Sequence, residues 1–226
     1  MNNKWLSIAI FMALYINLSR GYSALEDARI IAEYKKGLSV KGIRSKPNEL
    51  NHAEIARKLV HQTNWASVAT ISQDPAIKGF PMVNIISIND NDVHQKSTGR
   101  IQFLLTDLDF TGIDRQVNNR STFLFTDEQR LHCSQPSGYH VPSIDPMEPT
   151  CARVMISGQI KKLDKNSRDY DPALVSFVER HPAAKNWIKA HEFYLCELEI
   201  ENIYVLDFYG GPHNVKPDDY YNIKLE

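Results

Sequence analysis

Two hydrophobic periods divide the chain into helix-like and strand-like segments. From residue 51 to about residue 63 the apolar residues recur at helical spacing, and Asn51 followed by Glu54 is a helix-capping pattern. A second helix is expected to open at Asp171-Pro172, with proline at its first position. The apolar positions of the two helices are Ile55, Leu59 and Val60, then Leu174, Phe177 and Val178.

The remaining periodic segments are typical of strands. They cover residues 65–71, 80–88, 100–106, 121–126, 150–163 and 194–208, with a bend expected at Gly158. In the last of these, Tyr194, Cys196, Leu198 and Ile200 alternate with a face composed of Leu195 and three glutamates. Few helices and five or six strands predict a mainly β (α+β) domain. We predict a small antiparallel barrel, because a closed barrel leaves no strand edge exposed. An open α+β sheet is the alternative.

The first residues do not follow the pattern of the domain. Lys4 precedes an apolar run, Trp5–Leu18, and small residues allow cleavage after Gly21 or after Ser23. A basic start, a short apolar core and a small-residue end are typical of a secretory signal peptide, and the run is shorter than the roughly 20 residues of a membrane anchor. We therefore assign residues 1–23 to a signal peptide.

Residues 24–49 are rich in Lys and Arg and poor in large apolar side chains. A flexible arm is the favoured interpretation, and a basic contact segment or processing site is the alternative. Residues 50–226 then form the folded domain.

Composition excludes several classes of protein. The 226 residues carry 26 Lys and Arg against 27 Asp and Glu, and removing residues 1–23 changes the formal charge from −1 to −3. A nucleic-acid-binding protein would normally be strongly basic. We find no phosphate-binding loop, nucleophile elbow, metalloprotease or dinucleotide motif, so the residues themselves indicate no catalytic or metal site.

The chain has three cysteines, which could form a disulfide, stay as free thiols or take part in a reactive site. Cys133 and Cys151 flank a segment rich in Pro, Ser and Gly, and in a secreted chain they are most simply a disulfide, although other pairings stay open. Cys196, on the apolar face of a strand, is expected to be a buried thiol. His132 and His140 suggest a metal site or a cysteine nucleophile with a base. A loop disulfide with exposed histidines is the simpler interpretation.

Asn119-Arg-Ser121 is an N-glycosylation sequon, and we predict a surface glycan on Asn119. A second sequon at Asn17 lies within the signal peptide.

Four segments together resemble the CREG family, whose name refers to repression of genes stimulated by an adenoviral early protein. They are Trp65-Ala-Ser-Val-Ala-Thr-Ile-Ser72, Met155-Ile-Ser-Gly158, Arg180-His-Pro182 and Asn202-Ile-Tyr-Val-Leu-Asp-Phe-Tyr-Gly-Gly-Pro212. The resemblance covers about residues 50–226, and the final segment, which continues to Asn222, is the most specific.

The resemblance implies a split β-barrel of the flavin-binding, pyridoxamine-phosphate-oxidase-like kind, assembled as a homodimer. It also implies a secreted glycoprotein of the extracellular space, endosomes and lysosomes, without enzymatic activity, that restrains growth and promotes differentiation. The implied partner is a sorting receptor of the mannose-6-phosphate/insulin-like growth factor II type. One rival function is an FMN-dependent oxidoreductase on the same barrel. The other is a nuclear repressor, and the predicted signal peptide disfavours this second function.

Flavin-binding relatives tend to carry a basic residue after the third strand. The corresponding stretch here is Thr106–Asp114, with Ile113 at the expected lysine position and three carboxylates that would repel a phosphate. Arg115 and Arg120 are possible substitutes, although surface charges are the simpler interpretation. We therefore expect no bound cofactor, with FMN as the alternative.

The sequence departs from its relatives in its glycosylation sites. The stretches around Asn166, Asn202 and Asn222, where relatives carry sequons, contain none here. A glycan on the mature chain would therefore have to be on Asn119.

Overall fold

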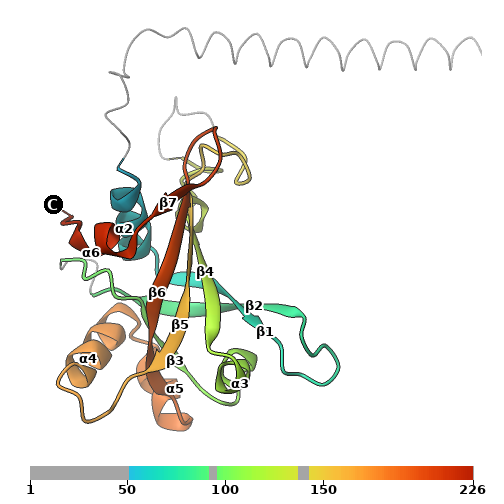
Figure 1. The fold of residues 1–226 in the computed structure, drawn as a ribbon. Coiled ribbons are helices and arrows are strands. Elements are labelled where there is room, and N and C mark those ends of the chain that lie inside the picture. The colour runs from blue at the N-terminus through green and yellow to red at the C-terminus, as the bar shows by residue number, and fades with distance from the viewer. Residues whose placement is uncertain (1–50, 92–95, 137–142, 226) are drawn as a thin grey trace, which may run out of the picture. The chain divides into compact units, whose positions relative to one another are not determined.

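The computed structural model describes residues 51–91, 96–136 and 143–225 (Figure 1). The predicted signal peptide, the arm over residues 24–49 and His140 lie outside these ranges.

Six strands of the described chain close into an antiparallel barrel (Figure 1). Around the barrel their order is β2 (Pro81–Asn89), β1 (Trp65–Ile71), β4 (Arg120–Thr126), β5 (Arg153–Lys162), β6 (Tyr194–Leu206) and β3 (Gln102–Leu105). Closure occurs at β3, because Phe103 pairs with Ile88 on one side and with Cys196 on the other. The predicted barrel is confirmed, and the open-sheet alternative is wrong.

The long strand β6 extends beyond the closed ring. Its first residues pair with β3, and its last residues pair along the same edge with β7 (His213–Val215). Its pairing with β5 is interrupted once, where Ser157 faces Asn202 but Gly158 faces Ile200. A Cβ at Gly158 would lie 2.1 Å from the carbonyl oxygen of Glu199, so only glycine permits this close approach.

The main hydrophobic core fills the barrel and includes one face of α2 (His52–Gln62). Asn51 caps this helix by accepting a hydrogen bond from the Glu54 amide, as predicted. Arg57 of α2 donates to the carbonyl oxygen of Tyr220 at 2.8 Å, which ties α2 to α6 (Pro217–Asn222). The largest fully buried side chains include Tyr220, Phe103, Phe123 and Phe125.

A second hydrophobic cluster lies outside the barrel, where α4 (Tyr170–Arg180) and α5 (Ala184–Ala190) cover β3 and β6. Leu104 and Leu195 pack there with Phe177, so both faces of these strand segments are buried. Leu195 therefore lies on the face of β6 that carries the three glutamates, but it is buried beneath these helices.

One helix begins at a different residue than predicted, and the structure contains more helices than the sequence pattern indicated. Helix α4 begins at Tyr170, so Pro172 occupies its third position, where a missing N–H is still tolerated. Helices α3 (Phe110–Val117), α5 and α6, the short helix η1 (Asp127–Arg130) and strand β7 were not predicted.

Candidate functional site

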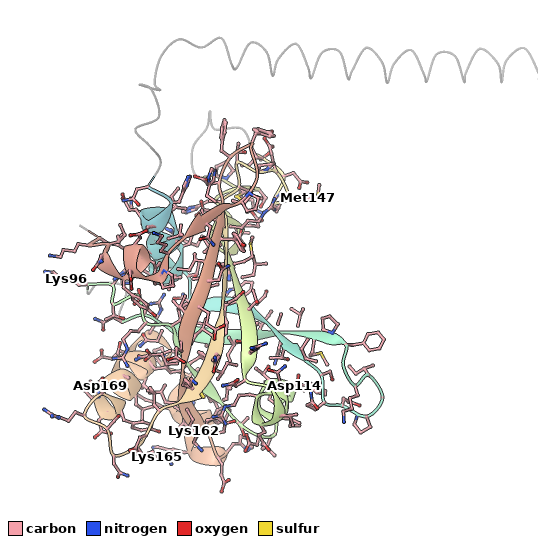
Figure 2. The ribbon with its side chains drawn as sticks, in the orientation of Figure 1. Lys96, Asp114, Met147, Lys162, Lys165 and Asp169 are labelled. Carbon is pink, nitrogen blue, oxygen red and sulfur yellow. A yellow bond between two sulfur atoms is a disulfide. The ribbon has the colours of Figure 1, made fainter. Side chains whose placement is uncertain are left out.

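The stretch that follows β3 first makes a turn, in which the Asp109 amide donates to the Thr106 carbonyl oxygen at 3.2 Å, and then enters α3 (Figure 2). Asp109 is the N-cap residue in extended conformation, and the helix begins at Phe110. A Cβ at Gly112 would lie 2.1 Å from the carbonyl oxygen of Thr106, so α3 packs directly against the backbone at the end of β3. In the sequence analysis, this stretch was compared with the one that carries a basic residue in flavin-binding relatives.

The three carboxylates of this stretch have partners within the protein. Asp109 accepts from Asn84 Nδ2 at 2.8 Å, and Asp107 accepts from the Tyr194 hydroxyl. Asp114 is buried and accepts from Thr70 Oγ1 at 2.6 Å and from the Gln73 amide at 2.7 Å. These contacts hold α3 against β1, β2 and β6.

The hydrogen bond between Tyr194 and Asp107 affects the pKa of both groups. It is the largest cause of the lowered pKa of Asp107, and burial followed by the same bond raises the pKa of Tyr194. Two cations lie over the Tyr194 ring: Lys162 Nζ is 4.3 Å from the ring centroid and the Arg115 guanidinium carbon is 5.7 Å away. Asp107 is therefore held in its charged form, and Tyr194 stays a neutral donor.

The residues after β3 do not fit a flavin phosphate. A phosphate at the start of α3 would meet Asp107 and Asp109, which repel it, and Ile113 at the expected lysine position offers no donor. Arg115 contacts the Tyr194 ring, and Arg120 lies on β4 at an open groove on the outside of the barrel. The three carboxylates thus have separate partners on β6, β2 and β1. Of the two candidate arginines, Arg115 lies near Asp107, whose pKa is lowered first by the Tyr194 hydrogen bond and also by the charge of Arg115.

That groove is a shallow hollow of about 280 Å³ across the outer faces of β1, β4, β5 and β6. Arg120 and Glu201 are its charged residues, and the other lining residues are hydroxyl, apolar or glycine. It is lined by Ala69, Thr70, Ile71, Pro81, Arg120, Ser121, Thr122, Ser157, Gly158 and Glu201.

Beside the groove, a row of side chains crosses five strands on the same outer face. Strand register places them as direct neighbours in the order Ile85, Ser67, Leu124, Met155 and Tyr204, which we call the outer row. Ile85 is 64% exposed and Tyr204 42% exposed.

Beyond the outer row, Val83 on β2 and Phe80, just before β2, are each 65% exposed. Sequence reasoning missed this surface. The available signal was that residues 80–88 are apolar on both faces of the strand, which is typical of a strand covered on both sides.

The structure joins Cys133 to Cys151 in a disulfide, with Cα atoms 5.7 Å apart. The Cys133 sulfur is therefore not a thiolate, and His132 lies 3.9 Å from Asp127 as a partly exposed pair. Cys196 is buried and free in the barrel, and burial raises its pKa to about 12. A thiol in that environment is neutral and unreactive.

Asn119 lies immediately before β4 and is partly exposed. Its side-chain amide donates to Gln159 Oε1 at 3.3 Å, so a glycan would have to replace this hydrogen bond. Ser121, the third residue of the sequon, is buried in the folded domain. The glycan on Asn119 stays a prediction.

Comparison with known proteins identifies the family. The family model described as "CREG, beta-barrel" matches residues 47–222. The chain is 34% identical over 172 residues to Protein CREG1 of Mus musculus, covering 76% of this chain and 74% of the mouse protein. It is 33% identical over 180 residues to Protein CREG1 of Homo sapiens, covering 80% of this chain and 78% of the human protein.

Solved structures resemble the fold at low sequence identity. A heme binding protein from Mycobacterium smegmatis has a TM-score of 0.56 at 17% identity, covering 80% of this chain and 62% of its own. ChuZ of Campylobacter jejuni has a TM-score of 0.57 at 14% identity, covering 78% of this chain and 63% of its own. Among the described residues, no helix has the length and apolarity needed to span a membrane. The family match and the closed six-stranded antiparallel barrel lead to one conclusion: this chain belongs to the CREG family and has its split β-barrel fold.

Proposed function

We propose that the protein is a secreted, homodimeric CREG protein without enzymatic activity. It acts in the extracellular space, endosomes and lysosomes, where it restrains growth and promotes differentiation by binding a receptor. Family membership and the signal-peptide pattern of residues 1–23 support secretion.

The observation that carries the non-enzymatic part of this proposal is the set of carboxylates after β3. Asp107 and Asp109 stand where a phosphate would approach the start of α3, and each is already hydrogen-bonded within the domain. Replacing their partners with a phosphate would bring like charges together. We therefore assign no catalytic residue, cofactor or metal role to this stretch.

The receptor is proposed to be of the mannose-6-phosphate/insulin-like growth factor II type. Recognition through a phosphorylated glycan would depend on Asn119, because the mature chain has no other sequon. Recognition through the protein surface would not depend on that residue. The two modes therefore predict different results for an Asn119 variant.

The first test uses the protein purified from the medium of secreting cells. We expect a colourless preparation that releases no flavin on denaturation and takes up no added FMN at tens of micromolar. An absorbance scan followed by mass spectrometry of released small molecules makes this measurement. A flavin band with about one FMN per chain would overturn the non-enzymatic assignment and favour the oxidoreductase alternative.

The same preparation tests receptor capture. Fluorescently labelled protein should enter the lysosomes of cells that express the receptor and not of matched cells that lack it. Asn119→Gln should abolish uptake if the glycan is the ligand, and Asn166→Gln, outside any sequon, is the control. Equal uptake by both cell lines would contradict the proposed receptor.

A further inference from the structure

Two histidines and an aspartate that are far apart in sequence meet where α2 begins and β6 ends. His52 is the first residue of α2, Asp207 follows β6, and His213 opens β7. One ligand atom from each lies within 4.8 Å of the others. This cluster is separate from the carboxylates around α3, and neither the proposed function nor the sequence motifs use it.

The central carboxylate is buried without a hydrogen bond from the described chain. The Asp207 side chain is only 5% exposed, and within the described chain both of its oxygens are buried and accept no hydrogen bond. His52 Nδ1, which faces it, is buried and unpartnered as well. A buried, unsatisfied carboxylate is costly, so its retention suggests a ligand that would compensate the charge.

The separation between His52 and Asp207 suits two ligands of one metal better than a hydrogen bond. His52 Nδ1 and Asp207 Oδ2 are 3.4 Å apart, which is long for a charge-assisted hydrogen bond. Two ligand atoms at about 2.0–2.1 Å from one tetrahedral ion lie roughly 3.3 Å apart. The observed distance between His52 Nδ1 and Asp207 Oδ2 is therefore close to that of two ligands of one ion.

We propose that His52, Asp207 and His213 bind one divalent transition cation, for which Zn²⁺ is the representative ion. Imidazole and carboxylate are ligands of the type that zinc accepts, and three protein ligands leave a fourth position for water. The bound ion would neutralise Asp207 and join the beginning of α2 to the chain between β6 and β7.

One rearrangement accompanies binding. The His52 and His213 rings are stacked, with centroids 3.9 Å apart and planes 15° from parallel. Lone pairs of parallel rings do not converge on one ion, so at least one imidazole must rotate about its side-chain torsions. His213 is exposed at the start of a three-residue strand, and it is the ring with room to turn.

The competing explanation is that the three residues form only a stacked pair beside an ion pair. Zinc titration of the chelator-stripped full-length secreted protein, in competition with a chromogenic zinc indicator, separates the two. We expect one Zn²⁺ per chain with a dissociation constant in the micromolar range or below. Because binding favours the folded state, a hundredfold excess over that constant should raise the melting temperature by about 5 °C or more.

Three variants make the test specific. His213→Gln and His52→Gln should each weaken zinc binding at least tenfold and remove the thermal shift, since each deletes one of three ligands. His191→Gln, an exposed histidine after α5, should bind zinc as the unsubstituted protein does. Circular dichroism in the absence of metal verifies that all three are folded.

Two outcomes would overturn the proposal. One is the absence of stoichiometric zinc binding at 100 µM metal. The other is equal binding by the unsubstituted protein and His213→Gln, which would place the ion elsewhere in the chain.

Discussion

At the scale of single residues, buried polar groups determine how the ends of elements meet. Asp90 has no exposed surface, and its carboxylate accepts from the Thr98 and Gly99 amides and from the hydroxyls of Ser97 and Thr98. Ser97 in turn accepts from Arg57 Nε at 2.8 Å. The end of β2, the segment before β3, and α2 are therefore joined through one carboxylate.

His181 makes a comparable contact at the end of α4. Its Nε2 lies 2.8 Å from the carbonyl oxygen of Ile88, which requires the ring to donate its proton there. Burial, together with the nearby charge of Arg180, lowers the pKa of His181 below the ordinary value of 6.5. The neutral ring is therefore the form that the folded protein favours.

This pKa shift gives a pH dependence with a definite sign. Because the unfolded His181 binds a proton at higher pH than the folded one, stability should fall as the pH drops through about 6.5 towards the lower folded pKa. The carboxylates with lowered pKa, such as Asp107, add their losses only at more acidic pH. His181→Gln should flatten the decline in melting temperature between pH 7.5 and 5.5. His191→Gln should keep the original slope, and an unchanged slope in His181→Gln would contradict this account.

At the scale of elements, α3 depends on one close backbone contact. By helix propensity alone, Gly112→Ala should stabilise α3 by up to about 1 kcal/mol. The added Cβ, however, would lie 2.1 Å from the Thr106 carbonyl oxygen, so backbone must move and the hydrogen bonds of Asp114 with it. We expect a net destabilisation of about 1–3 kcal/mol.

Urea unfolding measures the effect of Gly112→Ala. Val117→Ala, at a 71% exposed position of the same helix, is the control and should change stability by less than about 0.5 kcal/mol. A Gly112→Ala variant as stable as the unsubstituted protein would show that α3 can shift without cost.

Several of the elements predicted from the sequence owe their pattern to burial on one face. Strands β1, β4 and β5 alternate regularly, and α2 has a capping residue and an apolar stripe, so their positions were predicted within a few residues. Helix α3 was missed because its buried residues are Thr111, Gly112 and Asp114, which carry no apolar period.

Candidate sites could be predicted from the sequence only where their residues are neighbours along the chain. The carboxylates after β3 were named from the sequence, because they lie close together along the chain. The cluster of His52, Asp207 and His213 was not, since only the pairing of β6 with β7 and the packing of α2 bring these residues together. The outer row likewise depends on strand register that no local pattern specifies.

At the scale of the whole molecule, the outer row is the surface that we propose for the homodimer interface. It presents Ile85 with the exposed Val83 on β2, and half-buried Leu124 and Met155 continue it across the barrel. Exposed apolar side chains on one face are what a self-complementary twofold interface would cover.

A charge placed in the outer row should separate the subunits. We expect a dimer in equilibrium sedimentation at micromolar concentration, and Ile85→Lys should raise the dimer dissociation constant at least a hundredfold by burying an unpaired charge. Val175→Lys, at a 57% exposed apolar position on α4, is the matched control and should stay dimeric. A monomeric unsubstituted protein would contradict the homodimer, and a dimeric Ile85→Lys would place the interface elsewhere.

The way the barrel closes has a consequence for biosynthesis. The pairing of Phe103 with Cys196 joins strands that emerge from the ribosome far apart in time, so β3 has an open edge until β6 has been made. Such non-local pairing gives the domain a high contact order, which slows folding and exposes β3 to intermolecular association. A nascent chain that ends before about residue 197 therefore cannot close its barrel, and the free edge of β3 is open to pairing with other chains during that interval.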